Sequence, residues 1–224
     1  MPENIDPDLC THINYAFSTL DYTQLIMKPY DTWADIDNEF YKRVTAYSQY
    51  GIKVLISIGG WNDSAGDKYH RLVNNPVARA KFVKSALAFV KRYGFDGIDL
   101  DWEYPSLSSD FINVMTYDFH GSWDKQTGHV SPLYAHPDDV DPFFNTDYSI
   151  TNWINNGADP QKVIMGFPLY GQSFALADSE YVLSKGLGGA MIWALDLDDF
   201  MNRCGTGEYP LLKTINRVLR GYAK

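Results

Sequence analysis

One short segment, residues 96–103 (DGIDLDWE), constrains this chain more than any other. Side chains alternate between the two faces of a β-strand, so a strand here places Asp99, Asp101 and Glu103 on one face and apolar side chains on the other. Three stacked carboxylates on a mostly buried strand are costly unless they share protons or bind a cation. The pattern therefore indicates a functional site rather than a solvated acidic edge.

Two kinds of chemistry use such a stack. A divalent cation would take the oxygens as ligands, whereas acid catalysis would use repulsion between the carboxylates to raise the pKa of one of them. We favour acid catalysis because no histidine or further acid cluster stands at a comparable site. Glu103, at the carboxyl end of the strand, is then the expected proton donor, and no metal is expected.

Strand and helix patterns alternate on both sides of this segment. The strand candidates are residues 12–18, 53–60, 95–103, 111–119, 163–170 and 189–195, and helical patterns cover residues 36–47, 76–93, 147–156 and 211–219. This alternation predicts an α/β fold with a parallel sheet, whose functional residues stand at the carboxyl ends of the strands. We expect one domain over residues 1–224.

One connection is too short for this architecture. Only six residues separate Tyr104, at the end of the acidic strand, from Phe111, where the next strand pattern begins. A parallel crossover needs a dozen or more residues, usually with a helix, and six residues reach at most about 20 Å. Either the two strands are not neighbours in a regular barrel, or a segment is absent.

Composition excludes several classes of partner. With 19 Lys and Arg against 28 Asp and Glu, the net charge is −9, which argues against nucleic-acid and anionic-membrane binding. The longest apolar stretch, residues 191–197, is too short to span a bilayer, and the first residues do not form a secretory signal. We expect a mature, truncated or cytosolic form. Cys10 and Cys204 fit no metal-binding spacing.

The acidic segment resembles the signature Asp-x-x-Asp-x-Asp-x-Glu of family 18 glycoside hydrolases, the chitinases. Residues 57–60 (SIGG), 115–118 (MTYD), 166–171 (GFPLYG) and 189–193 (GAMIW) are similar to further motifs of that family. The resemblance runs over essentially the whole chain and is to arthropod chitinases. It implies a TIM (β/α)8 barrel.

The resemblance also implies a retaining, substrate-assisted mechanism acting on β-1,4-linked N-acetylglucosamine polymers. Glu103 would protonate the glycosidic oxygen while the acetamido carbonyl of the substrate attacks the anomeric carbon to form an oxazolinium ion. Asp101 would hold the acetamido N–H and share a proton with Asp99. Tyr117 would bind the acetamido oxygen, and Asp118 would support the sugar. The implied substrate-binding residues are Trp193, as the floor beneath the sugar, with Tyr170, Met115, Trp61, Phe17 and Gly60.

Some of these residues have a simpler interpretation when taken alone. A tryptophan in an apolar strand, such as Trp193, is more often a core residue than a sugar platform. Trp61 either lines an outer subsite or covers the rim of the barrel. Residues 62–64 (NDS) are either a glycosylation sequon or a helix cap.

Three parts of the family pattern are missing. The first strand would precede residue 1, a helix, a strand and another helix would follow Pro105, and a small α+β subdomain would follow Asp178. We therefore expect an incomplete barrel of about six strands with exposed strand edges. The family partners of Cys10 and Cys204 would lie in the absent segments, so both cysteines are expected to be unpaired thiols.

Three functions follow as hypotheses. The first is a secreted, extracellular chitinase-type hydrolase that binds chitin or chito-oligosaccharides and needs no cofactor. The alternative is a weak or inactive chitin-binding pseudoenzyme or fragment; the intact Glu103 favours the enzyme, and the missing strands favour the binder. The third is a metal-dependent enzyme that uses the acid stack as ligands. We expect a monomer, with self-association through exposed strand edges as the other possibility.

Overall fold

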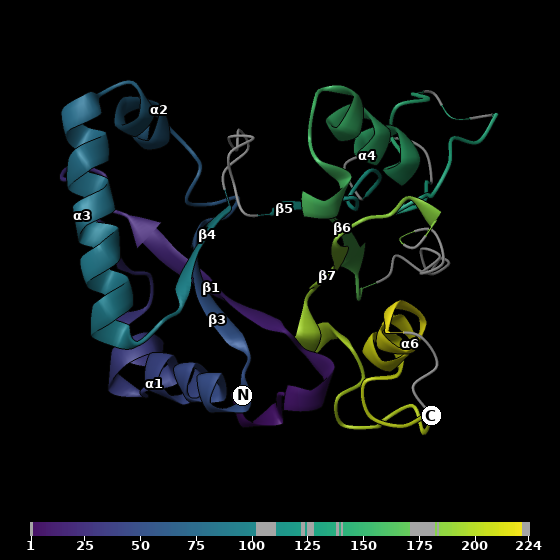
Figure 1. The fold of residues 1–224 in the computed structure, drawn as a ribbon, viewed down its shortest axis with the longest axis horizontal. Coiled ribbons are helices and arrows are strands. Elements are labelled where there is room, and N and C mark those ends of the chain that lie inside the picture. The colour runs from purple at the N-terminus through teal and green to yellow at the C-terminus, as the bar shows by residue number, and fades with distance from the viewer. Residues whose placement is uncertain are drawn as a thin grey trace. The chain divides into compact units, whose positions relative to one another are not determined.

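The computed structural model of the 224-residue chain describes residues 2–101, 111–121, 124, 128–137, 139, 141–170, 182 and 184–220. The chain groups into two compact units, residues 1–105 and residues 106–224 (Figure 1). The single domain over residues 1–224 stays a prediction.

The first unit is built on a sheet with the strand order β2-β1-β3-β4. Its strands are β1 (His12–Leu20), β2 (Met27–Pro29), β3 (Lys53–Gly59) and β4 (Gly97–Asp101). Strands β1, β3 and β4 are parallel, as the alternating pattern predicts, while β2 folds back antiparallel onto the end of β1. Strand β2 was not expected from the sequence pattern.

The turn between β1 and β2 is made by an aspartate. Asp21 Oδ1 accepts the backbone N–H groups of Thr23 at 2.9 Å and Gln24 at 2.7 Å. A short aspartate side chain that bonds the backbone two and three residues ahead stabilises a tight turn. This reversal carries the chain back along β1.

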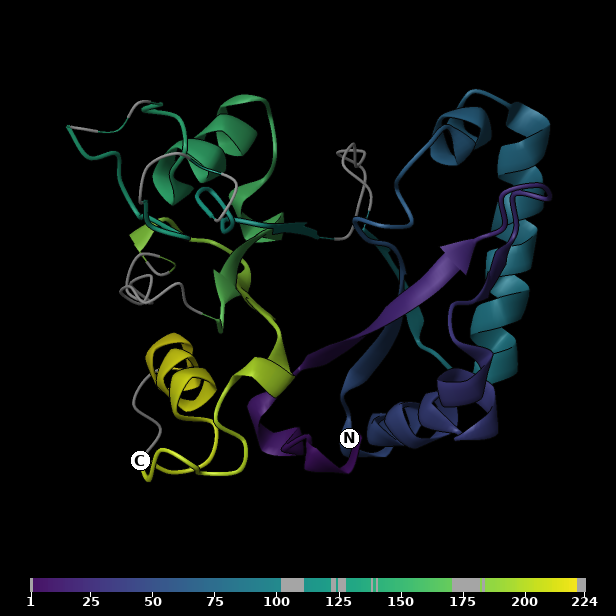
Figure 2. The same ribbon diagram turned by 180° about the vertical axis from the view of Figure 1, so that it is seen from behind.

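Helix α3 (Pro76–Tyr93) begins and ends where the sequence predicts. Asn75 Oδ1 accepts the N–H groups of Val77 at 3.0 Å and Ala78 at 3.2 Å, and Gly94 ends the helix with a φ of +79°. Figures 1 and 2 both show α3 running along one side of the first sheet.

The helix predicted over residues 36–47 is broken into shorter pieces. It becomes a π-helical turn (Trp33–Asp37), α1 (Phe40–Thr45) and a 3-10 stretch (Ala46–Tyr50). Glu39 has a φ of +54°, which a helix interior does not tolerate, so the pieces cannot join. Helix α2 (Lys68–Val73) follows β3 and was not predicted, and short 3-10 turns cover Pro2–Asn4 and Pro7–Leu9.

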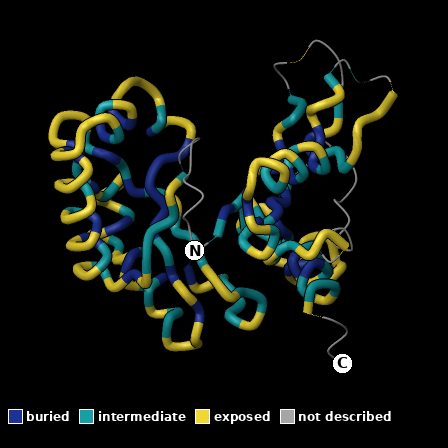
Figure 3. The backbone as a smooth tube through the Cα atoms, turned by 45° about the horizontal axis from the view of Figure 1, so that its top comes forward, coloured by how far each residue is buried: buried dark blue, intermediate teal, exposed yellow. Residues whose placement is uncertain are grey.

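Aromatic side chains fill the core of the first unit. The ring of Tyr41 has four aromatic neighbours, Tyr15, Phe89, Tyr93 and Phe95, at centroid distances of 5.0 to 5.7 Å and mostly edge to face. Aromatic residues make up 15% of the chain, and many of those in the first unit thus serve packing. Most residues of β3 (Lys53–Gly59) are buried, whereas no residue of β4 is (Figure 3).

The second unit has a parallel sheet with the strand order β5-β6-β7. Its elements are β5 (Ile112–Val114), α4 (Thr146–Asn155), a 3-10 turn (Pro160–Lys162), β6 (Val163–Pro168), β7 (Gly189–Trp193), a 3-10 turn (Leu195–Leu197) and α6 (Pro210–Leu219). Buried Asp198 stabilises the first turn of α6 because its Oδ2 accepts the N–H of Leu212 at 3.0 Å. The predicted strands are all present here, each shorter than expected.

Strand β5 shows why the strands are shorter. The prediction covers residues 111–119, but the strand ends at Val114. The hydroxyl of buried Thr116 donates to the carbonyl of Gly166 at 2.7 Å, and Asp118 has a φ of +58°, so the backbone turns out of the strand. This turn contains three of the predicted site residues, Met115, Tyr117 and Asp118.

Two further findings bear on the sequence predictions. Within the described ranges, no helix is both long and apolar enough to cross a membrane. Cys10 and Cys204 are both thiols in the structure.

Candidate functional site

Strand β4 presents two of the three predicted carboxylates. Its register with β3 places Asp99 beside Ser57 and Asp101 beside Gly59. The hydroxyl of buried Ser57 donates to Asp99 Oδ2 at 2.7 Å, which fixes this half-buried carboxylate against the sheet. Asp99 and Asp101 are two residues apart in a strand and so share one face, as predicted.

The backbones of β3 and β4 approach each other closely beyond this pair. Gly60 donates its N–H to the carbonyl of Asp101 at 3.1 Å. A Cβ on Gly59 would lie 2.1 Å from the same carbonyl oxygen, and Gly59 has a φ of +121°. Only glycine fits this position, which explains the glycine pair of the SIGG motif.

Phe17 and Trp61 flank the glycine pair. A Cβ on Gly60 would lie 3.0 to 3.2 Å from the ring of Phe17, so the ring lies directly on the Gly60 backbone. Trp61 follows and is 87% exposed. It covers little of the described protein, and its place in an outer subsite stays a prediction.

In the second unit, three predicted residues are in contact. The hydroxyl of Tyr170 donates to Asp118 Oδ1 at 2.5 Å, and its ring meets the ring of Tyr117 edge to face, with centroids 6.3 Å apart. Burial, with the nearby Asp118 carboxylate, raises the pKa of Tyr170 above its ordinary value. Tyr170 therefore keeps its proton and acts as a donor to Asp118.

A glycine shapes the wall behind Tyr117. A Cβ on Gly166 would lie 2.6 Å from the carbonyl oxygen of Val114 and 2.9 Å from the ring of Tyr117. Tyr117 is buried against this surface, while Met115 is 52% exposed. The turn after β5 thus separates a buried ring from an exposed thioether.

Trp193 ends strand β7. It pairs with Pro168, and its carbonyl accepts the N–H of Leu169 at 2.9 Å. The residue is 37% exposed, more than a buried core tryptophan would be. Its role as the floor beneath a sugar stays a prediction.

The described residues do not test the predicted role of Glu103, and they add Ser57 to the site. Glu103 lies outside the described residues, so its role as proton donor stays a prediction. The metal-binding hypothesis needs Glu103 as a third ligand; within the described ranges, no group of three His, Cys, Asp or Glu residues could hold a metal ion. Ser57 was not predicted as a site residue, although it stands in the SIGG motif that signalled the site.

Comparisons with known proteins agree with the motifs. The family model described as Glycosyl hydrolases family 18 matches residues 2–110 and 106–180. "Probable chitinase 10" of Drosophila melanogaster is 39% identical over 350 residues, covering 99% of this chain and 15% of the relative. "Probable chitinase 2" of the same organism is 34% identical over 245 residues, covering 83% of this chain and 50% of the relative. The chain thus spans half or less of these two relatives.

A solved structure extends the likeness to the fold. Catalytic domain 2 of the Ostrinia furnacalis Group II chitinase matches with a TM-score of 0.92 and 36% identity, covering 99% of this chain and 91% of that chain. One of its structures is a complex with penta-N-acetylchitooctaose, (NAG)5. The predicted TIM-barrel-type α/β fold is confirmed, and the partial sheets of the described residues are consistent with an incomplete barrel.

Proposed function

This chain belongs to glycosyl hydrolases family 18, as its motifs predict, and from that premise we propose that it hydrolyses chitin and chito-oligosaccharides. The observation that carries the proposal is the acid face of β4. Asp99 and Asp101 share this face, Ser57 holds Asp99, and the Gly59-Gly60 backbone is bonded to that of Asp101. Such preorganisation is what a site needs when charge develops only in the transition state.

The proposed reaction begins with proton transfer. Glu103 gives its proton to the glycosidic oxygen as the bond from that oxygen to the anomeric carbon breaks. The sugar that contains this anomeric carbon also carries the acetamido group, whose carbonyl oxygen bonds to the anomeric carbon and gives an oxazolinium ion. Water then attacks that carbon as its bond to the acetamido oxygen breaks, and one proton of the water passes to Glu103, with net retention of configuration. Asp101 orients the acetamido N–H, and Asp99 shares a proton with Asp101.

The second unit would supply contacts to the sugar. We assign Tyr117 to the acetamido oxygen and Asp118, held by Tyr170, to the bound sugar. Trp193 forms the floor of the subsite. The exposed Met115 and, in the first unit, Trp61, Phe17 and Gly60 complete the set of proposed binding residues.

A second candidate function is chitin binding without turnover. It is favoured by the way the chain matches its relatives: 350 positions are aligned against a chain of 224 residues, and the family model matches in two stretches that meet at residues 106–110. More than a third of the aligned positions therefore have no residue here. Losing part of the barrel could leave sugar affinity without catalysis. In either case we propose an extracellular, monomeric protein.

The deciding experiment measures fluorophore release from a labelled chito-oligosaccharide by the protein and by Glu103→Gln. This substitution keeps the shape of the side chain and removes its transferable proton. A working enzyme loses roughly 100-fold or more of its rate in the variant, the scale of general acid catalysis. If neither protein releases fluorophore but both bind (NAG)5, the chain is a binder. Activity that disappears with EDTA would instead favour the metal-dependent enzyme.

A further inference from the structure

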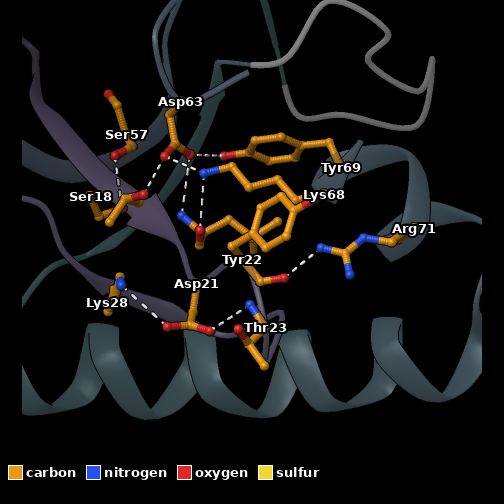
Figure 4. A network of polar contacts seen from close by, with 12 residues as sticks. Ser18, Asp21, Tyr22, Thr23, Lys28, Ser57, Asp63, Lys68, Tyr69 and Arg71 are labelled. Carbon is orange, nitrogen blue, oxygen red and sulfur yellow. Dashed lines mark hydrogen bonds and ion pairs between the residues drawn. The ribbon is translucent and has the colours of Figure 1, made fainter. Parts of the chain in front are cut away.

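A buried polar network lies at the carboxyl end of β1 and is not used by the proposed chemistry (Figure 4). At its centre, Asp63 accepts hydrogen bonds from Lys68 at 2.5 Å, Tyr69 at 2.6 Å and the backbone N–H of Leu20 at 3.2 Å. The hydroxyl of Thr19 is a fourth donor to Asp63. We call Asp63, Lys68, Tyr69 and Thr19 the Asp63 network.

The network is almost closed to water. The side chains of Asp63 and Lys68 are 5% and 10% exposed, and Tyr69 is 6% exposed as a residue. Burial acts to raise the pKa of Asp63, but the hydrogen bonds from Lys68, Thr19 and Tyr69 outweigh it, so the pKa is lowered. Asp63 is therefore a buried carboxylate paired with a buried cation.

The two charged side chains replace a missing strand partner. The pairing of β1 with β3 ends at Ser18 and Ile58, so the next residues of β1 have no strand on that side. There Asp63 binds the N–H of Leu20, while Lys68 donates to the carbonyl of Leu20 at 3.0 Å. The network thus satisfies backbone groups that would otherwise be buried and unpaired.

The same contacts hold the loop that carries Trp61. The segment between β3 and α2, residues 60–67, forms turns without a regular helix or strand, and the N–H of Ser64 bonds the carbonyl of Gly60 at 2.9 Å. Trp61 is 87% exposed and has little packing of its own. Its position therefore depends on the anchors of the loop, and Asp63 is two residues away.

We propose that the Asp63 network positions this loop and so sets the orientation in which Trp61 is presented to a sugar ring. The members of the network are positioning residues and touch no substrate. The sugar as ligand rests on the proposed function, whereas the positioning of Trp61 does not.

The first test follows Trp61 directly. The chain has six tryptophans, so the protein labelled with 5-fluorotryptophan gives a ¹⁹F NMR spectrum in which Trp61→Phe and Trp193→Phe each identify one resonance. Asp63→Asn is expected to shift or broaden the Trp61 resonance and leave that of Trp193 in place. Asp67→Asn is the matched control, because it makes the same change on the same loop at an exposed pair with Arg71 (3.3 Å).

A milder variant keeps this test decisive if Asp63→Asn does not fold. Tyr69→Phe removes one hydrogen bond to Asp63 and leaves the ion pair intact. The proposal predicts the same change at Trp61, smaller in size. An unchanged Trp61 resonance in folded Tyr69→Phe and in any folded Asp63→Asn would overturn it.

The second test connects positioning to binding. The affinity for (NAG)5 is measured by calorimetry for the protein, Trp61→Ala, Asp63→Asn and the double variant. If the network acts through Trp61, Asp63→Asn weakens binding about tenfold in the original protein and has no effect once Trp61 is removed. An equal loss in both backgrounds contradicts positioning through Trp61. If the unchanged protein does not bind (NAG)5, the proposed function fails, and the NMR result alone decides the positioning.

Discussion

Each unit contains a lysine–aspartate pair, and the two pairs differ in burial. In the first unit, the Lys68–Asp63 pair is buried, with side chains 10% and 5% exposed. In the second, the Lys185–Asp147 pair has a separation of 3.1 Å but side chains 39% and 31% exposed. Water can replace a lost partner at an exposed pair but not at a buried one. Losing the lysine should therefore destabilise the protein more at the buried Lys68–Asp63 pair than at the exposed Lys185–Asp147 pair.

The largest predicted effect tests this difference. Lys68→Met leaves the Asp63 carboxylate buried without its cation and should lower the free energy of unfolding by about 3–5 kcal/mol. Lys185→Met, the same change at the exposed pair, should cost no more than about 1 kcal/mol. Urea unfolding of both variants checks this. Equal losses would mean that the burial of Lys68 has no energetic consequence.

The units are alike in another respect, because each uses a glycine where the chain passes close to a site residue. Gly166→Ala would push its methyl group into Val114 and Tyr117, and overpacking of this kind costs about 1–3 kcal/mol. Displacing Tyr117 should also lower the rate of hydrolysis. Gly189→Ala, on neighbouring β7, is the control, since its methyl group would meet Ile164 at an ordinary 3.6 Å. A Gly166→Ala variant as stable and active as the control would show that Val114 and Tyr117 can move to accommodate the methyl group.

Two buried aspartates of the first unit should respond to pH in opposite directions. The lowered pKa of Asp63 means that its stabilising contribution is present above the ordinary value of 3.8 and is lost as the pH falls. Burial raises the pKa of Asp35 despite hydrogen bonds from Tyr15 and the N–H of Asp31, so its contribution is present below 3.8 and is lost as the pH rises.

Unfolding measured across the acidic range separates the two aspartates. The stability difference between the protein and Asp63→Asn should shrink toward low pH. The difference for Asp35→Asn should instead change in the opposite sense, with the protein losing its advantage as the pH rises. Parallel curves for the two variants would contradict the assigned directions.

The sequence predicts much of this protein because its strands are local patterns. The six predicted parallel strands are present, and the acid alternation on β4 places Asp99 and Asp101 as expected. The start of α3 at Pro76 and its end before Gly94 are equally local. Resemblance to family motifs supplied the roles of residues such as Tyr117, which no spacing could have assigned.

What the sequence did not predict depends either on contacts between distant residues or on single residues at which the backbone turns. The Asp63 network joins residues 19 and 63, which are 44 positions apart, and no periodicity marks such a pair. Strand β2 depends on an aspartate turn, and the break before α1 depends on the positive φ of Glu39. Neither a contact between distant residues nor a turn at a single residue changes the periodicity of apolar residues, so neither can be detected from that pattern.

The smallest predicted effect lies at Leu100, on the other face of the acid strand. The apolar pattern of this face predicts burial, but Leu100 is 58% exposed, so in the described part of the chain little covers it. Leu100→Thr should therefore change the free energy of unfolding by no more than about 0.5 kcal/mol. Leu20→Ala, at a 1% exposed position of the same sheet, should cost about 2–5 kcal/mol. A large loss for Leu100→Thr would mean that this face of β4 is covered in solution, and that the barrel is more complete than the two sheets indicate.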